Sequence, residues 1–362
     1  MTVTLVAIAQ YGGITHYSQC LANALAPHLP VRVIVPEGTD VGGYGSAVTA
    51  VPLPVPMEFS WREIRRSPQR LRELPAFLKA LEGPQDDVIH FLNRHEYLTL
   101  AAPRVRQRLA VTLHDPRPHR GERSPRKLLA NWTLRRNARE IFVFGDLLKQ
   151  HLIEQGVPPQ KVTVVPHGTF GSFTITDTPP DEQPTALFFG RILPYKGLDV
   201  LLRAAPLIRQ RIPDLRLLIA GEGDVSPYAD LLAAEQATGQ MQLINRFVSD
   251  AEMAQLLARS SVVVLPYLEA TQSGVVPLAY GARRPVVATA VGAIPEIINN
   301  GRTGLLVPPN DPVALADATA TLLADPKLAD VLAAGGQQYA SDTLSWEAIA
   351  QTTLGVYERI VD

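Results

Sequence analysis

The stretch that organises the chain runs from residue 188 to residue 199 and reads Phe188-Phe189-Gly190-Arg191-Ile192-Leu193-Pro194-Tyr195-Lys196-Gly197-Leu198-Asp199. The apolar run 186–189 is typical of a buried strand, and the apolar spacing after Gly197 predicts a helix over 198–208. Arg191 and Lys196 therefore lie in a short loop between a strand and a helix. Two cations in such a turn suit a polyanion such as a diphosphate, because a guanidinium fork and an ammonium charge bind phosphate oxygens together. On this stretch alone, the alternative of two solvated surface charges stays open.

The composition is that of a globular protein large enough for two domains. The chain has 362 residues, of which 46% are hydrophobic and 19% are charged, and these values argue against a disordered chain. The single cysteine, Cys20, excludes an internal disulfide framework and favours a reducing compartment. Residues 3–9 lack the basic region of a secretory signal, and no apolar run approaches the ~18 residues of a spanning helix. We therefore expect a cytoplasmic protein.

The net charge of −1 hides an asymmetry between the two halves. Residues 1–170 contain 21 Lys and Arg against 14 Asp and Glu, a balance of +7, whereas residues 171–362 contain 13 against 21, a balance of −8. Chance surface composition is one explanation. The other is that the first half faces an anionic partner, such as a phosphate-bearing acceptor or the inner face of a membrane, on which the protein would lie peripherally. The basic segments show no regular interleaving with aromatic residues, so we expect no nucleic acid partner.

Strand and helix patterns alternate along the whole chain, which predicts doubly wound parallel sheets. The alternation is interrupted at 171–184, where the sequence is rich in Thr, Pro and Asp and has no core pattern. We therefore expect two Rossmann-like domains facing across a cleft. The expected bounds are 1–172 for the first domain, 173–184 for the linker, 185–340 for the second domain and 341–362 for a closing helix.

Several polar or glycine-rich segments follow predicted strands, at the edge where ligands collect in parallel sheets. Gly12 and Gly13 follow the first strand and would let a ligand approach a helix amino terminus. His114 and Asp115 follow the strand 109–113, and a histidine that only bonds within its loop is the alternative there. Ser273 and Gly274 open a helix after another strand end. No Asp-x-Asp pair is present for a metal ion, so the cations Arg191 and Lys196 are expected to take the place of Mg²⁺ at the diphosphate.

Several motifs of the second half together resemble one protein family, the GT-B-fold glycosyltransferases of family 4 (glycosyl transferase group 1). The segments that carry the resemblance are Gly190-Arg191 through Lys196-Gly197, 220–223, 285–289 through Pro295-Glu296, 300–307 and Ser345-Trp346. In the first half the resemblance rests on Gly12-Gly13, His114-Asp115 and 166–168.

The resemblance implies a retaining transfer of a sugar from a nucleotide donor, of the UDP or GDP type, with no metal ion and no other cofactor. Arg191 and Lys196 would grip the diphosphate. The nucleotide and donor sugar would contact a further set of residues: Gly12, Gly13, Gly190, Arg246, Phe247, Val248, Thr271, Gln272, Ser273 and Gly274. His114 would lie near the reacting face of the sugar. The acceptor would be a glycan, a lipid-linked molecule or a small molecule, and the final helix would cross back onto the first domain.

One departure from the family pattern concerns the usual Glu-x7-Glu pair. In register, the first Glu position is Ala270, one residue after Glu269, and the second is Leu278. The second Glu normally binds the ribose hydroxyls, and an aliphatic side chain accepts no hydrogen bond. Glu269 is the candidate for the role of the first Glu from a shifted loop. Two other functions stay open: a non-catalytic GT-B binding subunit, motivated by Ala270 and Leu278, and a nucleotide-sugar 2-epimerase.

Overall fold

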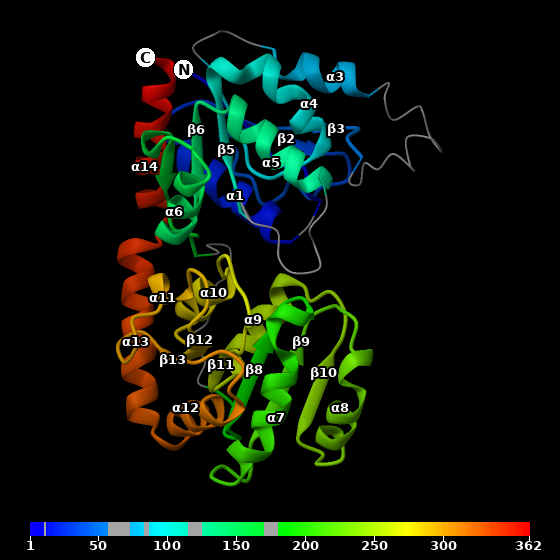
Figure 1. The fold of residues 1–362 in the computed structure, drawn as a ribbon, viewed down its shortest axis with the longest axis vertical. Helices are drawn as coiled ribbons and strands as arrows, with labels where there is room; N and C mark the ends of the chain where they lie inside the picture. Colours follow the sequence, from blue (N-terminus) through cyan, green and yellow to red (C-terminus); the bar gives the residue numbers. More distant parts are fainter. Residues whose placement is uncertain (11, 57–72, 83–86, 115–124, 170–179) are drawn as a thin grey trace. The chain divides into compact units, whose positions relative to one another are not determined.

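The computed structural model describes residues 1–10, 12–56, 73–82, 87–114, 125–169 and 180–362. The chain divides into two compact units, which are considered separately. Unit 1 comprises residues 1–168 together with 346–362, and unit 2 comprises residues 169–345. Figure 1 shows that each unit is built around one twisted sheet flanked by helices.

Unit 1 contains a seven-stranded parallel sheet with the strand order β3-β2-β1-β4-β5-β6-β7. Its strands are β1 (Val3–Val6), β2 (Val31–Pro36), β3 (Val48–Leu53), β4 (Val88–Phe91), β5 (Leu109–Thr112), β6 (Glu140–Val143) and β7 (Val162–Val164). Its described helices are α1 (Gly13–Leu25), α3 (Leu74–Ala80), α4 (Glu96–Val105), α5 (Pro125–Asn137), α6 (Asp146–Glu154) and α14 (Trp346–Val361). The strand order reverses between β1 and β4, which is where ligands bind in open sheets of this kind.

Unit 2 contains a six-stranded parallel sheet with the order β10-β9-β8-β11-β12-β13. Its strands are β8 (Thr185–Phe189), β9 (Arg216–Ala220), β10 (Met241–Ile244), β11 (Val262–Leu265), β12 (Val286–Thr289) and β13 (Leu305–Val307). Its helices are α7 (Leu198–Arg209), α8 (Ala229–Gln236), α9 (Asp250–Arg259), α10 (Val275–Gly281), α11 (Ile294–Ile297), α12 (Pro312–Ala324) and α13 (Pro326–Thr343). Here the order reverses between β8 and β11. The predicted fold class, two doubly wound parallel sheets, is confirmed.

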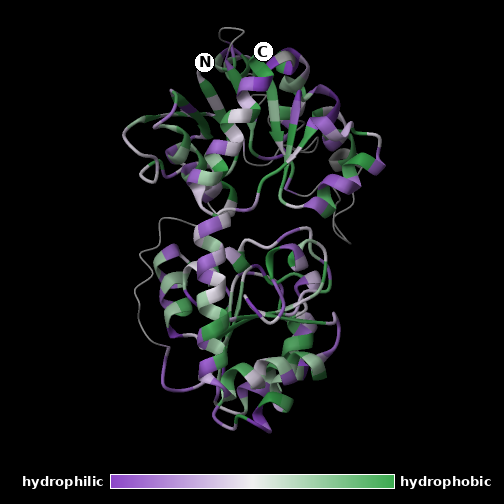
Figure 2. Cartoon of the chain, turned by 90° about the vertical axis from the view of Figure 1, so that its left-hand side faces the viewer, coloured by the Kyte–Doolittle hydropathy of each residue, from purple (hydrophilic) through white to green (hydrophobic). Residues whose placement is uncertain are grey.

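The apolar strand runs are explained by burial on both faces of each sheet. In β8, Phe188 belongs to one apolar cluster, with α7 and α12, while Leu187 belongs to the cluster on the other face, with α9 and α10. Because successive side chains of a strand point to opposite faces, a sheet covered by helices on both sides needs apolar residues at every position. Figure 2 shows the resulting concentration of hydrophobic residues in the strands.

Helix α14 is part of the core of unit 1. Its Tyr357 is fully buried, and the Tyr357 hydroxyl lies 2.6 Å from Nδ1 of His90 on β4. The other ring nitrogen of His90, Nε2, lies 2.8 Å from the Thr112 hydroxyl on β5. Both polar ends of the buried imidazole are therefore satisfied, and α14 is tied to the centre of the sheet by a specific contact as well as by apolar packing.

Three buried histidines of unit 1 predict an acid-sensitive fold. Burial lowers the pKa of His90 to about 3 and the pKa values of His95 and His167 to about 4. In the unfolded chain these rings are protonated near pH 6.5. Their stabilising contribution to the free energy of unfolding is therefore complete above pH 6.5, and it is lost as the pH falls towards their pKa values in the folded state. Between pH 7.5 and 5.5, we expect the free energy of unfolding to fall by up to about 1.4 kcal/mol per pH unit for each histidine.

Urea unfolding at a series of pH values measures this slope. His90→Gln, which keeps a polar side chain between Tyr357 and Thr112 but does not titrate, should flatten it. A slope that is equal in the wild type and in His90→Gln would contradict the assignment.

Candidate functional site

The loop that leaves β8 is fitted closely against the end of β9. Gly190, with φ 121°, donates its N–H to the carbonyl of Ala220 (3.0 Å), and Ile192 donates to the carbonyl of Glu222 (2.8 Å). A Cβ atom at Gly221 would lie 2.0 Å from the Gly190 carbonyl oxygen, so only glycine permits this approach. As a result Arg191 lies just after β8, at the reversal of the strand order, and its side chain is exposed.

Lys196 is held by a second backbone contact, with the loop that leaves β11. It ends a 3-10 turn, Pro194–Lys196, and is followed by Gly197 in the left-handed region (φ 67°). A Cβ at Gly197 would lie 2.0 Å from the Pro266 carbonyl oxygen, and Leu268 donates its N–H to the Tyr195 carbonyl (2.7 Å). The Lys196 ammonium lies 3.7 Å from the centre of the Tyr267 ring.

Neither of these two cations is neutralised within the described part of the chain. Arg191 and Lys196 form no ion pair with a carboxylate of a described residue. Both lie in the loop that follows β8, and β8 pairs with β11 at the reversal of the strand order. The two cations thus lie at the end of a strand, as predicted. An anion bound there would meet two positive charges that no described carboxylate neutralises.

The segment from Glu269 to Gly274 links β11 to α10. Glu269, Thr271 and Gln272 are half-buried, and the buried Oε1 of Gln272 has no hydrogen-bond partner among the described residues. Ser273 is buried, and its hydroxyl accepts the N–H of Val275 (3.3 Å). Gly274 is the N-cap residue of α10. The structure therefore brings this predicted donor segment to the same strand edge as Arg191 and Lys196.

Leu278 lies in the interior of unit 2. It is 5% exposed and belongs to the apolar cluster on the α9–α10 face of the sheet. The position that the family pattern assigns to the ribose is therefore used for core packing in this chain. Any hydrogen bonds to ribose hydroxyls must come from other residues.

The segment Arg246-Phe247-Val248 follows β10, which ends at Ile244. The exposed Arg246 guanidinium donates two hydrogen bonds to Glu252, of 2.6 and 3.0 Å. Arg246, together with the N–H and hydroxyl of Ser249, lowers the pKa of the Glu252 carboxyl to about 2. Ser249 and Glu252 cap the start of α9 as a reciprocal capping box. Arg246 thus stabilises the start of α9, and Phe247 is 51% exposed.

In unit 1, Gly12 and Gly13 lie at the start of α1, and His114 belongs to an aromatic cluster. Gly12, with φ 83°, is the N-cap residue of α1, and Gly13 is the first residue of that helix. His114 lies 2.8 Å through Nε2 from the carbonyl of Leu92, and its ring packs against Tyr17 and Phe144. This contact joins the end of β5 to the end of β4, so His114 does not bond only within its own loop. Asp115 lies outside the described residues.

Two features of the site were not predicted from the sequence. One is the contact of the Tyr267 ring with the Lys196 ammonium. Asn245 accepts the N–H of Gly223 (3.0 Å) and so ties the end of β10 to that of β9. An aromatic residue after Pro266 and an Asn at the end of a strand were the available signals, but neither pattern identifies its contact partner.

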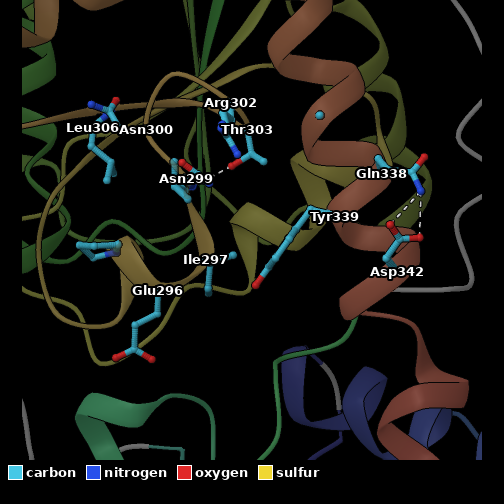
Figure 3. Close-up of a pocket in the computed structure, with 13 residues that line it drawn as sticks. Glu296, Ile297, Asn299, Asn300, Arg302, Thr303, Leu306, Gln338, Tyr339 and Asp342 are labelled. Carbon is cyan, nitrogen blue, oxygen red and sulfur yellow. Dashed lines mark hydrogen bonds between the residues drawn. The ribbon is translucent and has the colours of Figure 1, made fainter.

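A separate pocket of about 730 Å³ lies beside α11 and α13 (Figure 3). It includes several residues of the family motifs, among them Glu296, Asn300 and Arg302. The motif that follows β12 therefore lines a surface hollow as well as supporting the sheet. In the parts of the chain that the structure describes, no group of three or more His, Cys, Asp or Glu is arranged to hold a metal ion.

Comparison with known proteins identifies the fold and then the family. Sucrose-phosphate synthase from Thermosynechococcus elongatus matches with a TM-score of 0.77 at 22% identity, covering 99% of this chain and 98% of that one. Alr3699/HepE of Anabaena, in complex with UDP-glucose, matches with a TM-score of 0.72 at 18% identity, covering 99% and 100%. These likenesses show a GT-B fold.

The sequence comparisons cover both units. The family "Glycosyl transferase 4-like domain" matches residues 12–168, and the family "Glycosyl transferases group 1" matches residues 183–325. The phosphatidyl-myo-inositol mannosyltransferase of Mycobacterium leprae is 35% identical over 181 residues, which are 49% of this chain and 46% of that protein. The matched region spans about half the length of the curated relatives. The chain belongs to the family 4 glycosyltransferases of the GT-B fold.

The buried position of Leu278 yields a test of the core assignment. Leu278→Glu would place an unpaired carboxylate in an apolar cluster, and we expect it to lower the free energy of unfolding by at least about 3 kcal/mol. Leu278→Met, the volume-conserving control, should cost less than about 1.5 kcal/mol. Denaturant unfolding measures the free energy of unfolding of both variants. A stable Leu278→Glu protein with tighter nucleotide binding would show that residue 278 faces the ligand.

Proposed function

We propose that this protein is a retaining glycosyltransferase that moves a sugar from a nucleoside diphosphate sugar to a glycan, a lipid-linked molecule or a small molecule, without a metal ion. The observation that carries the proposal is the pair of unneutralised cations, Arg191 and Lys196, at the strand-order reversal of unit 2. Family membership supports the reaction class, and the complex of the Anabaena protein with UDP-glucose supports a nucleotide-sugar donor.

The proposed chemistry is a substitution at the anomeric carbon. The bond from this carbon to the leaving phosphate oxygen breaks, and the acceptor hydroxyl oxygen bonds to the same face of the sugar. The hydroxyl proton passes to the departing phosphate oxygen. Arg191 and Lys196 would stabilise the negative charge that develops on the diphosphate, which is the main electrostatic demand of the step.

Other residues have positioning roles in this proposal. The segment from Thr271 to Gly274 would hold the donor phosphates or sugar, and Glu269 would contact the donor sugar. The backbone of 246–248 would contact the base. In unit 1, His114 would contact the transferred sugar, and Gly12 and Gly13 would contact the diphosphate and the acceptor.

The cation assignment predicts a large loss of rate. Arg191→Ala and Lys196→Ala should each cost about 2 kcal/mol or more in transition-state stabilisation, a loss of roughly 30-fold in kcat/KM. Arg211→Ala is the matched control, because that exposed arginine contacts only Asp317, at 3.7 Å, among described carboxylates. A thermal-shift screen with UDP, GDP, ADP, CMP and dTDP first identifies the donor base.

Transfer assays with the corresponding sugar nucleotides then compare the variants. Near-normal turnover in both alanine variants would refute the assignment. Nucleotide binding without consumption of any sugar nucleotide would instead favour a non-catalytic GT-B subunit. Consumption without an acceptor would favour an epimerase. The anomeric configuration of the product, and activity in excess EDTA, test retention and metal independence.

We further propose that unit 1 lies peripherally on the inner face of an anionic membrane, where a lipid-linked acceptor would be found. The supporting surface is the α5 face, defined by Leu128, Leu129 and Trp132, whose side chains are 53%, 60% and 52% exposed. The Arg136 guanidinium lies over the Trp132 ring at 5.5 Å. Apolar side chains with a tryptophan and neighbouring arginines are the composition of an interfacial helix. No helix among the described residues is long and apolar enough to span a membrane.

Vesicle sedimentation tests the α5 face. We expect binding to vesicles that contain 30% phosphatidylglycerol, weaker binding to neutral phosphatidylcholine vesicles, and partial release at high salt because the arginine contribution is screened. Leu129→Ser with Trp132→Ser should reduce the bound fraction several-fold. Val331→Ser on α13, where Val331 is 63% exposed, serves as the control. Equal binding of the double variant and the control would contradict the role of this surface.

A further inference from the structure

At the proposed diphosphate site, the Lys196 ammonium contacts the face of the Tyr267 ring, and the Tyr195 ring lies farther away, at 5.4 Å. The ammonium lies 3.7 Å from the centre of the Tyr267 ring, well inside the range of a cation–π interaction. The Tyr267 side chain is fully buried, yet its hydroxyl has no hydrogen-bond partner among the described residues. The ring face, and not the hydroxyl, is therefore the part of Tyr267 that makes a specific contact.

The backbone on both sides of this contact is fixed. The Tyr267 carbonyl accepts the hydroxyl of Thr289 at the end of β12 (2.5 Å). On the other side, Gly197 packs directly on the Pro266 carbonyl, and Tyr195 accepts the N–H of Leu268. Main-chain contacts thus hold the backbone of residues 195–197 against the backbone of residues 266–268, and only the lysine side chain is left to be oriented.

An aromatic face has a property here that a carboxylate lacks. It attracts an ammonium through its quadrupole but leaves the positive charge unneutralised and the N–H donors available. A carboxylate in the same place would pair with the lysine and would repel an incoming diphosphate.

We propose that Tyr267 is a positioning residue, which orients the Lys196 ammonium towards the diphosphate through its ring face. The inference rests on the proposed function of Lys196. Loss of the ring leaves the lysine free to sample other rotamers, so its charge is no longer pre-organised where negative charge develops on the leaving group. The hydroxyl contributes nothing to this role, and its removal is tolerated.

The first experiment compares substitutions at residue 267. Tyr267→Leu should lower kcat/KM about tenfold, mainly through kcat, because the missing interaction is greatest in the transition state. Tyr267→Phe keeps the ring and removes only the unpartnered hydroxyl, so it should stay within about twofold of the wild type. A tenfold loss in Tyr267→Phe would overturn the proposal, since the hydroxyl would then be the functional group.

The second experiment keeps the shape of the ring and changes only its quadrupole. Phenylalanine, 4-fluorophenylalanine and 3,4,5-trifluorophenylalanine at residue 267 should weaken the binding of inorganic pyrophosphate in steps, as measured by calorimetry. These side chains differ little in volume, so the series remains informative even where Tyr267→Leu is unstable. Affinity that does not change along the series would overturn the proposal.

A double-mutant cycle separates this inference from the function on which it rests. In the Lys196→Met background, Tyr267→Leu should have no further effect on kcat/KM, because the ring has no cation to orient. Equal losses from Tyr267→Leu in both backgrounds would show a role independent of Lys196. Full activity of Lys196→Met alone would refute the diphosphate assignment of that residue, and the present inference with it.

Discussion

Unit 2 depends on the close backbone contact between the loop that follows β8 and the loop that follows β11. Gly197 lies directly on the Pro266 carbonyl, and Leu268 donates to Tyr195. These two loops leave neighbouring strands at the point where the strand order reverses. Because they are joined there, the cation-bearing turn and the Glu269–Gly274 segment lie at one edge of the sheet, and a ligand at that edge meets both.

This edge of the sheet carries positive charge that no carboxylate of a described residue neutralises. Many arginines of unit 2 have carboxylate partners, such as Arg246 with Glu252 and Arg209 with Glu235. Arg191 and Lys196 do not have one among the described residues. The lysine is held instead by an aromatic ring. Because Leu278 packs in the core, we propose that this protein binds its donor mainly through the diphosphate and not through the ribose hydroxyls.

Sequence reasoning predicted the parts of this structure that follow from burial. The interior residues of β8, β9, β11 and β12 are apolar because helices cover both faces of the sheet. Strand β3 was not predicted. It is an edge strand with partly exposed residues and a proline, Pro52, which only an edge position tolerates. Helix α13 was also missed, because its Gly336 gives no helical signal; that glycine packs against the Tyr280 ring, where a Cβ would lie 2.4 Å from Cδ1.

For the site, the sequence located the segments but not the contacts between them. Arg191, Lys196 and the segment around Ser273 could be placed at strand ends from pattern alone. The pairing of Lys196 with Tyr267 depends on a contact across 71 positions of the chain, which no local pattern encodes. A crystal structure with the nucleoside diphosphate that binds best would show whether the two cations bind the diphosphate of the donor. We expect phosphate oxygens within hydrogen-bond distance of both Arg191 and Lys196. Phosphates bound elsewhere on unit 2 would refute this assignment.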